Sequence, residues 1–239
     1  MENPTDQAEI NIIAKTPDYI VIEKPSGLLV HPSAPGKIEP SLLDYLAKHF
    51  PATKKFGDPT RPGLVHRLDK EVSGLMVIPR TKKMYEHLKT QFQDHTIEKH
   101  YTALVHGNVV KDEGEIKFKI ARSSTRARMA ARPAEEEEGR EAYTLFTTLE
   151  HLVGSSLMDI CIKTGRTHQI RAHFFAFNHP IIGDPIYRQK STKLKRTPGR
   201  IFLHSSKLAF TDLKGERVEF KSKLPKELKE FLKALNSKF

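Results

Sequence analysis

The sequence contains almost no cysteine. Cys161 is the only cysteine among 239 residues, so an internal disulfide framework and a thiolate-rich zinc site are both excluded. Because Cys161 falls in the apolar run 158–162, we expect a buried structural thiol rather than a reactive one.

Long hydrophobic runs and targeting signals are also missing. No stretch approaches the ~20 apolar residues of a membrane-spanning helix. Residues 1–9 are polar and acidic, and they have neither the basic segment nor the apolar stretch of a signal peptide. The chain shows no internal repeat and no flexible linker that would divide it. We therefore expect a cytoplasmic protein without a membrane partner.

Acidic residues are outnumbered by basic ones. The chain has 40 Lys and Arg against 29 Asp and Glu, and its sequence pI is near 9.6. Such an excess is typical of proteins that bind a polyanion, because phosphate contacts are made chiefly by Lys and Arg. Charge alone does not distinguish such a protein from a basic but otherwise ordinary soluble one.

Hydrophobic patterning predicts many short strands interspersed with a few helices. Ser41 and Thr81 are good N-caps for the first two helices. Helices are expected at residues 42–50, 82–92, 167–177 and 225–235. Strands are expected at residues 18–24, 75–78, 96–105, 115–120, 143–149, 157–163, 201–204, 207–210 and 217–220. This mixture indicates an α+β fold.

One stretch, residues 66–78, combines charged residues, a small turn and an apolar run. It reads His-Arg-Leu-Asp-Lys-Glu-Val-Ser-Gly-Leu-Met-Val-Ile. Residues 75–78 predict a buried strand, which places Asp69 in the connection that enters it, where a rigid sheet can hold the side chain still. Taken alone, an aspartate in such a position is typically a turn cap or the partner of a neighbouring arginine such as Arg67.

The run His-Arg-Leu-Asp-x-x-x-Ser-Gly resembles the catalytic motif of the RluA-type family of pseudouridine synthases, in which this aspartate is the nucleophile. Four further stretches resemble the family in the right order: residues 24–32, 91–107, 164–184 and 203–210. Together they extend across nearly all of the chain after Asp18. One such match can arise by chance, but five in order indicate membership of the family.

The resemblance implies a pseudouridine synthase catalytic fold. In this fold a mixed, largely antiparallel central sheet is flanked by helices, with an RNA cleft along the middle. We expect an N-terminal tail at residues 1–17 and one catalytic domain at residues 18–239, with no separate RNA-binding appendage. Selection of the target would then rest on the catalytic domain itself.

The function implied by the resemblance is the conversion of uridine to pseudouridine in ribosomal or transfer RNA. The reaction breaks the C1′–N1 glycosidic bond, turns the uracil and rejoins it through C5. As an isomerisation it requires no redox or group-carrying cofactor. It does require an ionised nucleophile, a way to hold the detached base and an acceptor for the C5 proton. We expect a monomer whose partner is RNA and whose target nucleotide is flipped out of the stack.

Three residues are assigned to catalysis by the resemblance. Asp69 is the nucleophile, and Arg171 matches the arginine that pairs with it; a cation within ~4–6 Å favours the charged carboxylate. Tyr101 matches a tyrosine that stacks on the uracil and is a candidate for receiving the C5 proton. On the sequence alone, Tyr101 could equally be a core aromatic of a strand. Arg171 could equally belong to a surface salt bridge.

Other residues are expected to contact the substrate. Arg67 matches the arginine that fills the space left by the flipped nucleotide, where a planar guanidinium can stack on neighbouring bases. His66 is expected to shape the loop. Ile170 either forms part of an apolar wall against the uracil or packs in the core. Arg166 and His168, in the third of the matching motifs, are expected near the RNA.

Two basic segments are further candidates for holding phosphate, residues 122–132 and 188–200. Residues 121–140 lose the strand periodicity and predict an exposed hairpin or loop whose arginines touch RNA; a solvated loop is the alternative. The run Glu135–Glu138 would repel phosphate, so we expect it to lie away from the RNA.

A metal site is not expected. His168 and His173 are five residues apart on the predicted helix, so they point roughly 140° away from each other. The zinc-binding spacing of four is absent, and no glutamate follows His168.

Two other functions stay open on the sequence. One is a catalytically silent RNA-binding or RNA-folding protein on the same scaffold. The other is a nuclease or nucleoside hydrolase with Asp69 as general base, which would need a second carboxylate or a metal cluster that the sequence does not display nearby.

Overall fold

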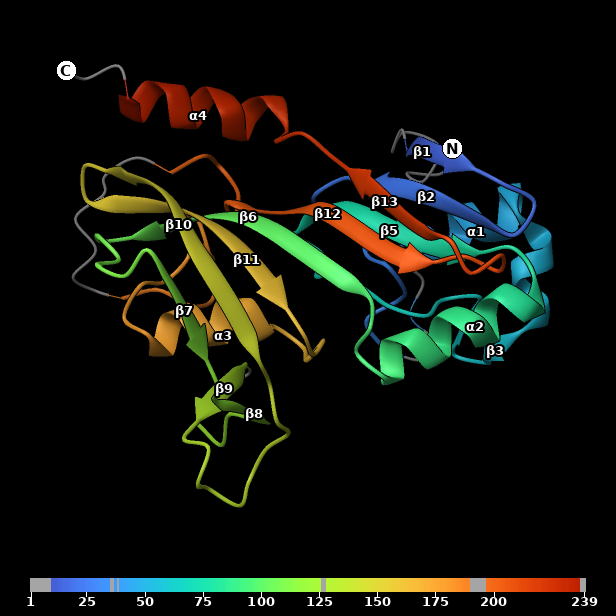
Figure 1. Ribbon diagram of the computed structural model, residues 1–239, viewed down its shortest axis with the longest axis horizontal. Helices are drawn as coiled ribbons and strands as arrows, with labels where there is room; N and C mark the ends of the chain where they lie inside the picture. Colours follow the sequence, from blue (N-terminus) through green and yellow to red (C-terminus); the bar gives the residue numbers. More distant parts are fainter. Residues whose placement is uncertain (1–9, 35–36, 38, 126–127, 190–196, 237–239) are drawn as a thin grey trace. The chain divides into compact units, whose positions relative to one another are not determined.

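The computed structural model describes residues 10–34, 37, 39–125, 128–189 and 197–236. The chain divides into two compact units, Met1–Glu98 with Lys207–Ser222, and Lys99–Ser206 with Lys223–Phe239. Mostly antiparallel strands and a few helices make up both units (Figure 1), so the predicted α+β class is confirmed. In these described ranges, no helix is both long enough and apolar enough to cross a membrane.

The first unit is built on a sheet. Its hydrogen-bonded order is β1 (Asn11–Lys15), β2 (Tyr19–Lys24), β5 (Ser73–Pro79) and β12 (Leu203–Thr211), with β13 (Arg217–Lys221) on β12. The pairs β1–β2, β2–β5 and β12–β13 are antiparallel. Only the part of β12 from Lys207 onward belongs to this unit. Every residue of β5 is buried, as the apolar run after the Asp69 motif predicts.

Two helices complete the first unit. Helix α1 (Leu42–His49) begins where the Asp44 carboxylate accepts hydrogen bonds from the N–H and hydroxyl of Ser41, at 2.9 and 2.7 Å. Helix α2 (Lys82–Gln93) begins where Thr81 Oγ1 accepts a hydrogen bond from the Met84 N–H at 3.2 Å. Both caps are the predicted ones. Between α1 and β5 lie the 3-10 helix η2 (Pro51–Lys55) and the short strands β3 (Gly57–Asp58) and β4 (Arg61–Pro62).

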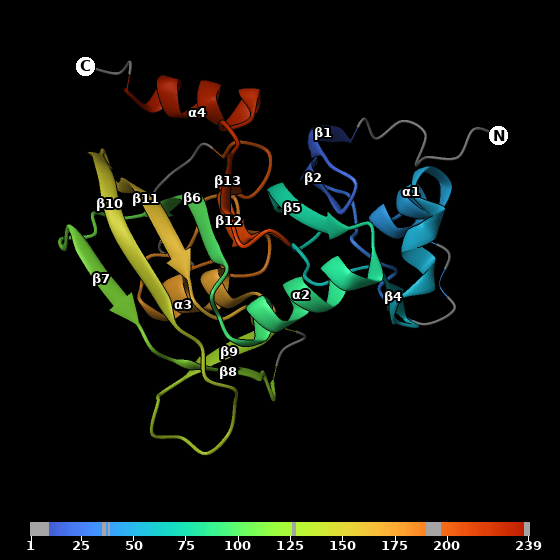
Figure 2. The same ribbon diagram turned by 45° about the vertical axis from the view of Figure 1, so that its right-hand side comes forward.

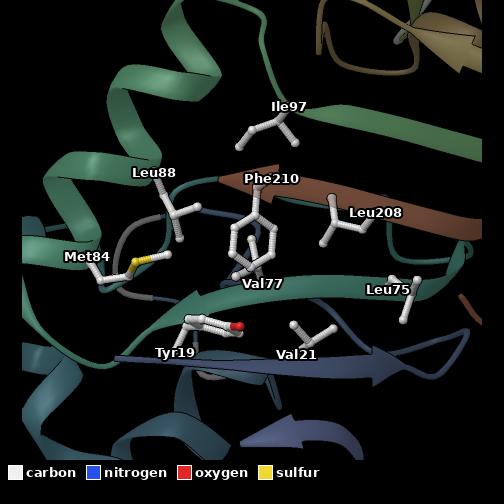
Figure 3. Packing of buried hydrophobic residues seen from close by; sticks show 9 residues of the cluster. All are labelled: Tyr19, Val21, Leu75, Val77, Met84, Leu88, Ile97, Leu208 and Phe210. Atoms are coloured by element: carbon white, nitrogen blue, oxygen red, sulfur yellow. The ribbon is translucent and has the colours of Figure 1, made fainter. Parts of the chain in front are cut away.

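The core of the first unit lies between α2 and the sheet (Figure 3). Met84 and Leu88 of α2 are fully buried there. Their cluster is completed by side chains from the strands and from the residue just before β6: Tyr19, Val21, Leu75, Val77, Ile97, Leu208 and Phe210. The rings of Tyr19 and Phe210 meet edge-on with centroids 5.1 Å apart. The four-residue spacing on α2 therefore forms one apolar stripe that packs on the sheet.

The second unit is also built on antiparallel strands. Its order is β6 (Glu98–His106), β11 (Ser155–Ile162), β10 (Thr144–Leu152) and β7 (Glu113–Ile116). Helix α3 (Gln169–Ala176) is buried from Gln169 to Phe174. Helix α4 (Lys226–Asn236) packs through Leu228 on a cluster formed by Leu104, Leu157, Ile182 and Phe202.

The structure corrects three strand predictions. The strand expected at residues 115–120 is two strands: β7 joins the main sheet, and β8 (Lys119–Arg122) pairs with β9 (Met129–Arg132) in a separate hairpin beside α3 (Figures 1 and 2). The break falls at Phe118, whose carbonyl accepts a hydrogen bond from His173 Nε2 at 3.0 Å. Two strands were expected, at residues 201–204 and 207–210. The structure has one strand, β12, which begins at Leu203 and runs through both, because buried Ser205 continues the sheet between them. Strand β1 falls inside residues 1–17, which were expected to be a tail.

The packing of α2 can be tested by truncating Leu88. Leu88→Ala removes a fully buried side chain between the helix and the sheet and leaves a cavity. We expect the free energy of unfolding to fall by about 2–5 kcal/mol in urea denaturation. The adjacent exposed substitution Lys89→Ala should change it by less than about 0.5 kcal/mol. Equal effects of the two substitutions would contradict this packing.

Candidate functional site

Asp69 lies in the loop that enters β5, as the sequence predicts. Its side chain is half-buried, and its carbonyl accepts a hydrogen bond from the Val72 N–H at 3.2 Å, which closes a turn just before the strand. Because β5 is buried along its whole length, the end of this loop is attached to the most completely buried strand of the first unit.

A buried ammonium group holds the Asp69 loop. Lys24, at the end of β2, is 0% exposed, and its Nζ donates hydrogen bonds to the carbonyls of Pro25, Leu28 and Lys70 at 2.8, 2.8 and 3.1 Å. Each of the three donors of the ammonium therefore has a carbonyl partner. Since Lys70 follows Asp69 directly, Lys24 joins the turn after β2 to the backbone beside Asp69.

The turn after β2 makes two more bonds to the same loop. The Gly27 N–H donates to the Lys70 carbonyl at 2.8 Å, and Ser26 Oγ donates to the Glu71 carbonyl at 2.6 Å. Gly27 has φ of 88°, a left-handed conformation that glycine adopts without steric cost. The Lys-Pro-Ser-Gly motif is thus a clamp on the loop that carries Asp69.

His66 and Arg67 occupy different environments in this loop. His66 Nε2 accepts a hydrogen bond from the Val77 N–H of β5 at 3.0 Å, and its ring stacks on Phe92 with centroids 4.8 Å apart. An accepting Nε2 carries no proton, so His66 is a neutral ring that shapes the loop, as expected. Arg67 is exposed, and its Nη1 donates to His31 Nε2 at 2.9 Å.

Tyr101 lies in β6 of the second unit and is only 7% exposed. It stands opposite Ile160 of β11 in the antiparallel register. Lys99 shares its face of the strand, and burial lowers the pKa of Lys99 to about 8. On the other face, His100 Nδ1 donates to Asp159 Oδ2 at 2.7 Å, and this hydrogen bond raises the pKa of His100 to about 10.

Arg171 belongs to a buried ion pair. Its Nε and Nη2 donate to the two carboxylate oxygens of Asp184 at 2.7 and 2.9 Å, and both side chains are 0% exposed. Burial acts to raise the pKa of Asp184, but the hydrogen bonds from Arg171 and from the N–H groups of Tyr187 and Ile186 outweigh it and lower this pKa. A salt bridge was one of the two interpretations of Arg171 from sequence, but its expected place on the surface is wrong.

The remaining predicted residues of the second unit surround α3. Ile170 is buried at 5% exposure. His168 is the N-cap residue of α3 with φ of 53°, and its Nδ1 lies 3.2 Å from the hydroxyl of Tyr187. Arg166 is half-buried, and its Nε donates to the Glu141 carbonyl at 2.9 Å. The structure therefore brings His168 and Arg171 to one neighbour, Tyr187, whose ring lies 5.3 Å from the Arg171 guanidinium.

A buried polar chain fixes the orientation of α3. Gln169 Nε2 donates to Thr144 Oγ1 at 2.9 Å, and this hydroxyl contacts His173 Nδ1 at 3.0 Å. The other ring nitrogen of His173 donates to the Phe118 carbonyl. Burial lowers the pKa of His173 to about 4, so its ring is neutral at pH 7. Within the described residues, no group of three or more His, Cys, Asp or Glu side chains is arranged to hold a metal ion.

The β8–β9 hairpin carries the predicted cluster of arginines. Arg122 is exposed, and Arg128 lies over the rings of Phe175 and Tyr187 at 4.5 and 5.0 Å. Arg132 lies 3.8 Å from Glu136 and 3.5 Å from Glu138. The acidic run therefore lies beside one of the arginines expected to contact RNA. In the second basic segment, residues 190–196 lie outside the described residues.

Two residues with structural influence on the site were not predicted from the sequence. Lys24 and Asp184 both stand in stretches that match the family, but neither was assigned a role. Lys24 bonds to Lys70, 46 residues away, and Asp184 pairs with Arg171, 13 residues away, and such distant pairing leaves no periodic signal. The only available signal was a lysine at the end of an apolar strand and an aspartate after a glycine.

Comparisons with known proteins agree on one family. The sequence profile described as "RNA pseudouridylate synthase" matches residues 18–176. An uncharacterised RNA pseudouridine synthase of Aquifex aeolicus is 43% identical over 190 residues, which are 78% of this chain and 58% of that protein. The ribosomal large subunit pseudouridine synthase D of Zymomonas mobilis is 32% identical over 241 residues, which are 98% of this chain and 75% of that protein.

A solved structure has the same fold. The human protein RNA pseudouridylate synthase domain containing 4 superimposes with a TM-score of 0.75 at 24% sequence identity, covering 95% of this chain and 93% of that chain. The match to the Aquifex protein spans less than two thirds of that protein's length, 58%.

The clamp on the Asp69 loop can be tested at Lys24. In Lys24→Met the carbonyls of Pro25, Leu28 and Lys70 lose a buried donor. We expect a loss of about 1–3 kcal/mol in the free energy of unfolding, and faster hydrogen exchange at the Gly27 amide. Lys70→Met, which removes an exposed ammonium from the clamped loop itself, serves as the control. Unchanged exchange at Gly27 in Lys24→Met would show that the ammonium does not hold the loop.

The buried His173 predicts an acid-sensitive stability. Its pKa is about 4 in the folded protein, below the ordinary value of 6.5 that it regains on unfolding. Between pH 6.5 and 4 the unfolded chain binds a proton that the folded protein does not bind, so the free energy of unfolding falls as the pH is lowered, by up to about 3 kcal/mol. His173→Gln should flatten this pH dependence in urea titrations, whereas His151→Gln, at an exposed position, should keep it.

Proposed function

The chain belongs to the RluA-type family of RNA pseudouridine synthases, and we propose that it isomerises specific uridines of large-subunit ribosomal RNA with Asp69 as the nucleophile. The observation that carries this proposal is that the loop carrying Asp69 is fixed to its surroundings by four hydrogen bonds. Lys24 and Gly27 donate to the Lys70 carbonyl, Ser26 donates to the Glu71 carbonyl, and His66 accepts from the N–H of Val77 in buried β5. A rigidly held carboxylate is what nucleophilic catalysis requires.

The proposed reaction conserves all atoms. The C1′–N1 bond of uridine breaks, the uracil turns, and C5 bonds to C1′; N1 gains a proton and C5 loses one. The Asp69 carboxylate stabilises or covalently captures C1′ while the base is detached. Tyr101, buried in β6, is the proposed contact of the uracil and the candidate acceptor of the C5 proton. Lys99 on the same face supplies a cation, and its pKa of about 8 is close to neutral pH.

The proposed role of Arg171 is electrostatic. Its guanidinium, oriented through Nε and Nη2 by Asp184, is a fixed positive charge in a water-excluded place. A charge fixed in this way favours an anionic nucleophile without reorganising during the reaction. Ile170, buried beside it in α3, is proposed to contribute to the apolar wall of the uracil site.

RNA binding is proposed to involve exposed cations of both units. Arg67, which is exposed in the Asp69 loop, is proposed to occupy the space of a flipped nucleotide, with its guanidinium supported by the hydrogen bond to His31. Arg122 of the hairpin and half-buried Arg166 are proposed phosphate contacts, and His168, two residues after Arg166, is proposed to lie near the RNA. The net charge of +11 favours association with any RNA, so these contacts position the substrate rather than select it.

The proposed target comes from the named relatives. The Zymomonas protein, aligned over nearly the whole of this chain, is a ribosomal large subunit pseudouridine synthase. We therefore propose large-subunit ribosomal RNA before transfer RNA, acted on by residues 18–239 as the catalytic domain.

Asp69→Asn tests the nucleophile. The amide has nearly the same shape but no negative charge, so we expect loss of pseudouridine formation by at least about 10³-fold with RNA affinity kept. Pseudouridine is mapped by carbodiimide modification and primer extension on unmodified ribosomal RNA, and affinity is measured by filter binding.

The matched control is Glu71→Gln, the same change two residues further along the loop, which should remain active. A wild-type protein that binds RNA but leaves every uridine intact would support a catalytically silent RNA-binding protein. Release of free uracil or cleavage of the strand would support a hydrolase. Pseudouridine in transfer RNA alone would correct the target but keep the chemistry.

A further inference from the structure

Tyr187 is in contact with two arginines that have different proposed tasks. The side chain is 1% exposed, and the guanidinium groups of Arg171 and Arg128 both lie over its ring, at 5.3 and 5.0 Å. A cation over an aromatic face within about 6 Å is attracted to it, and the attraction increases when water is excluded. One buried ring therefore touches both the arginine of the Asp184 pair and an arginine of the β8–β9 hairpin.

The hydroxyl of Tyr187 is bonded to the hairpin backbone. It donates to the Met129 carbonyl at 3.0 Å and accepts from the Met129 N–H at 3.1 Å, so it pairs with the first residue of β9 as a neighbouring strand would. Its single proton is used toward Met129, so the contact with His168 Nδ1 at 3.2 Å has the histidine as donor. Burial raises the pKa of Tyr187 to about 12, so the phenol keeps this proton at neutral pH.

The backbone of Tyr187 is bonded to the partner of Arg171. The N–H groups of Ile186 and Tyr187 donate to Asp184 Oδ1 at 2.8 and 3.0 Å, the same oxygen that accepts from Arg171 Nη2. A movement of the Tyr187 backbone therefore moves the carboxylate that orients Arg171. The hydroxyl is joined to this backbone through the rigid ring of the same residue, without a flexible chain.

The hairpin is also attached to α3 without Tyr187, because Arg128 lies over the ring of Phe175 and the Phe118 carbonyl, just before β8, accepts a hydrogen bond from His173. The hairpin stands outside the main sheet (Figure 2), and Ile120 bridges to Arg140. Its apolar contacts with α3 belong to a small cluster that itself includes Tyr187: Ile120, Met129, Ala131, Ala142, Ala172 and Phe175. Tyr187 thus takes part in both the apolar and the hydrogen-bonded attachment of the hairpin.

We propose that Tyr187 is a positioning residue that couples the β8–β9 hairpin to Arg171, so that an RNA phosphate bound by the hairpin sets the orientation of the guanidinium. This inference rests on the proposed function, in which Arg171 supports catalysis and the hairpin binds RNA. The coupling element is one residue. Its hydroxyl is hydrogen-bonded to the hairpin, its ring contacts both arginines, and its backbone N–H donates to Asp184. The hairpin then contributes to the rate of the reaction as well as to affinity for RNA.

A double-mutant cycle separates this coupling from a merely structural role. Tyr187→Phe keeps the ring and removes the hydroxyl, and Arg122→Gln removes an exposed hairpin charge. Single-turnover rates at saturating enzyme and dissociation constants are measured on unmodified ribosomal RNA. We expect each substitution alone to lower the saturating rate, roughly 2- to 30-fold for Tyr187→Phe, with Arg122→Gln also weakening binding. In the double variant, Arg122→Gln should weaken binding as before but slow the reaction no further.

The control is Tyr143→Phe, which removes a hydroxyl that donates to Glu115 in the same unit and should leave the rate unchanged. If Tyr187→Phe does not fold, Arg128→Met, which removes the hairpin cation over the ring, is expected to give the same loss of coupling. Multiplicative rate effects, or a wild-type rate in Tyr187→Phe, would overturn the inference while leaving the proposed function intact. A wild-type protein that forms no pseudouridine would overturn the proposed function and this inference with it.

Discussion

The buried ion pair between Arg171 and Asp184 is the interaction on which the packing of α3 against the segment from Asp184 to Tyr187 depends. Two charges at 0% exposure carry a desolvation cost of several kcal/mol each, which good geometry and further hydrogen bonds must offset. Both are present here: two parallel N–H···O bonds and two backbone amides on the same carboxylate. The pair therefore fixes the segment from Asp184 to Tyr187 against α3, because removal of either partner would take a buried opposite charge from the other.

The first unit uses the same physical device for a different loop. Lys24 is buried with its three donors on three carbonyls, and one of those carbonyls belongs to the residue after Asp69. A buried charge of this kind permits few backbone arrangements, since each alternative leaves a donor unsatisfied. In both units a buried cation thus specifies the conformation of a loop that apolar packing alone would leave undetermined.

The sequence predicted what depends on local pattern and on motif. The strand after Asp69, the caps at Ser41 and Thr81 and the stripe on α2 follow from periodicity and from short-range hydrogen bonds. The break at Phe118 did not, because it depends on His173, a residue 55 positions away. The burial of the Arg171 salt bridge, and the roles of Lys24 and Tyr187, likewise depend on partners that only the folded chain brings close.

Arg132 and Arg171 of the second unit differ in burial, and this difference decides whether each arginine can exchange its carboxylate partner. Arg132 lies 3.5 and 3.8 Å from half-exposed glutamates, and pairs of this kind are worth less than about 1 kcal/mol in water. An arriving phosphate can displace such carboxylates at small cost, so the acidic run beside the hairpin does not prevent its arginines from binding RNA. Arg171 cannot exchange its partner in this way, because Asp184 has no access to water. Exposed arginines therefore suit binding, and the buried arginine suits positioning.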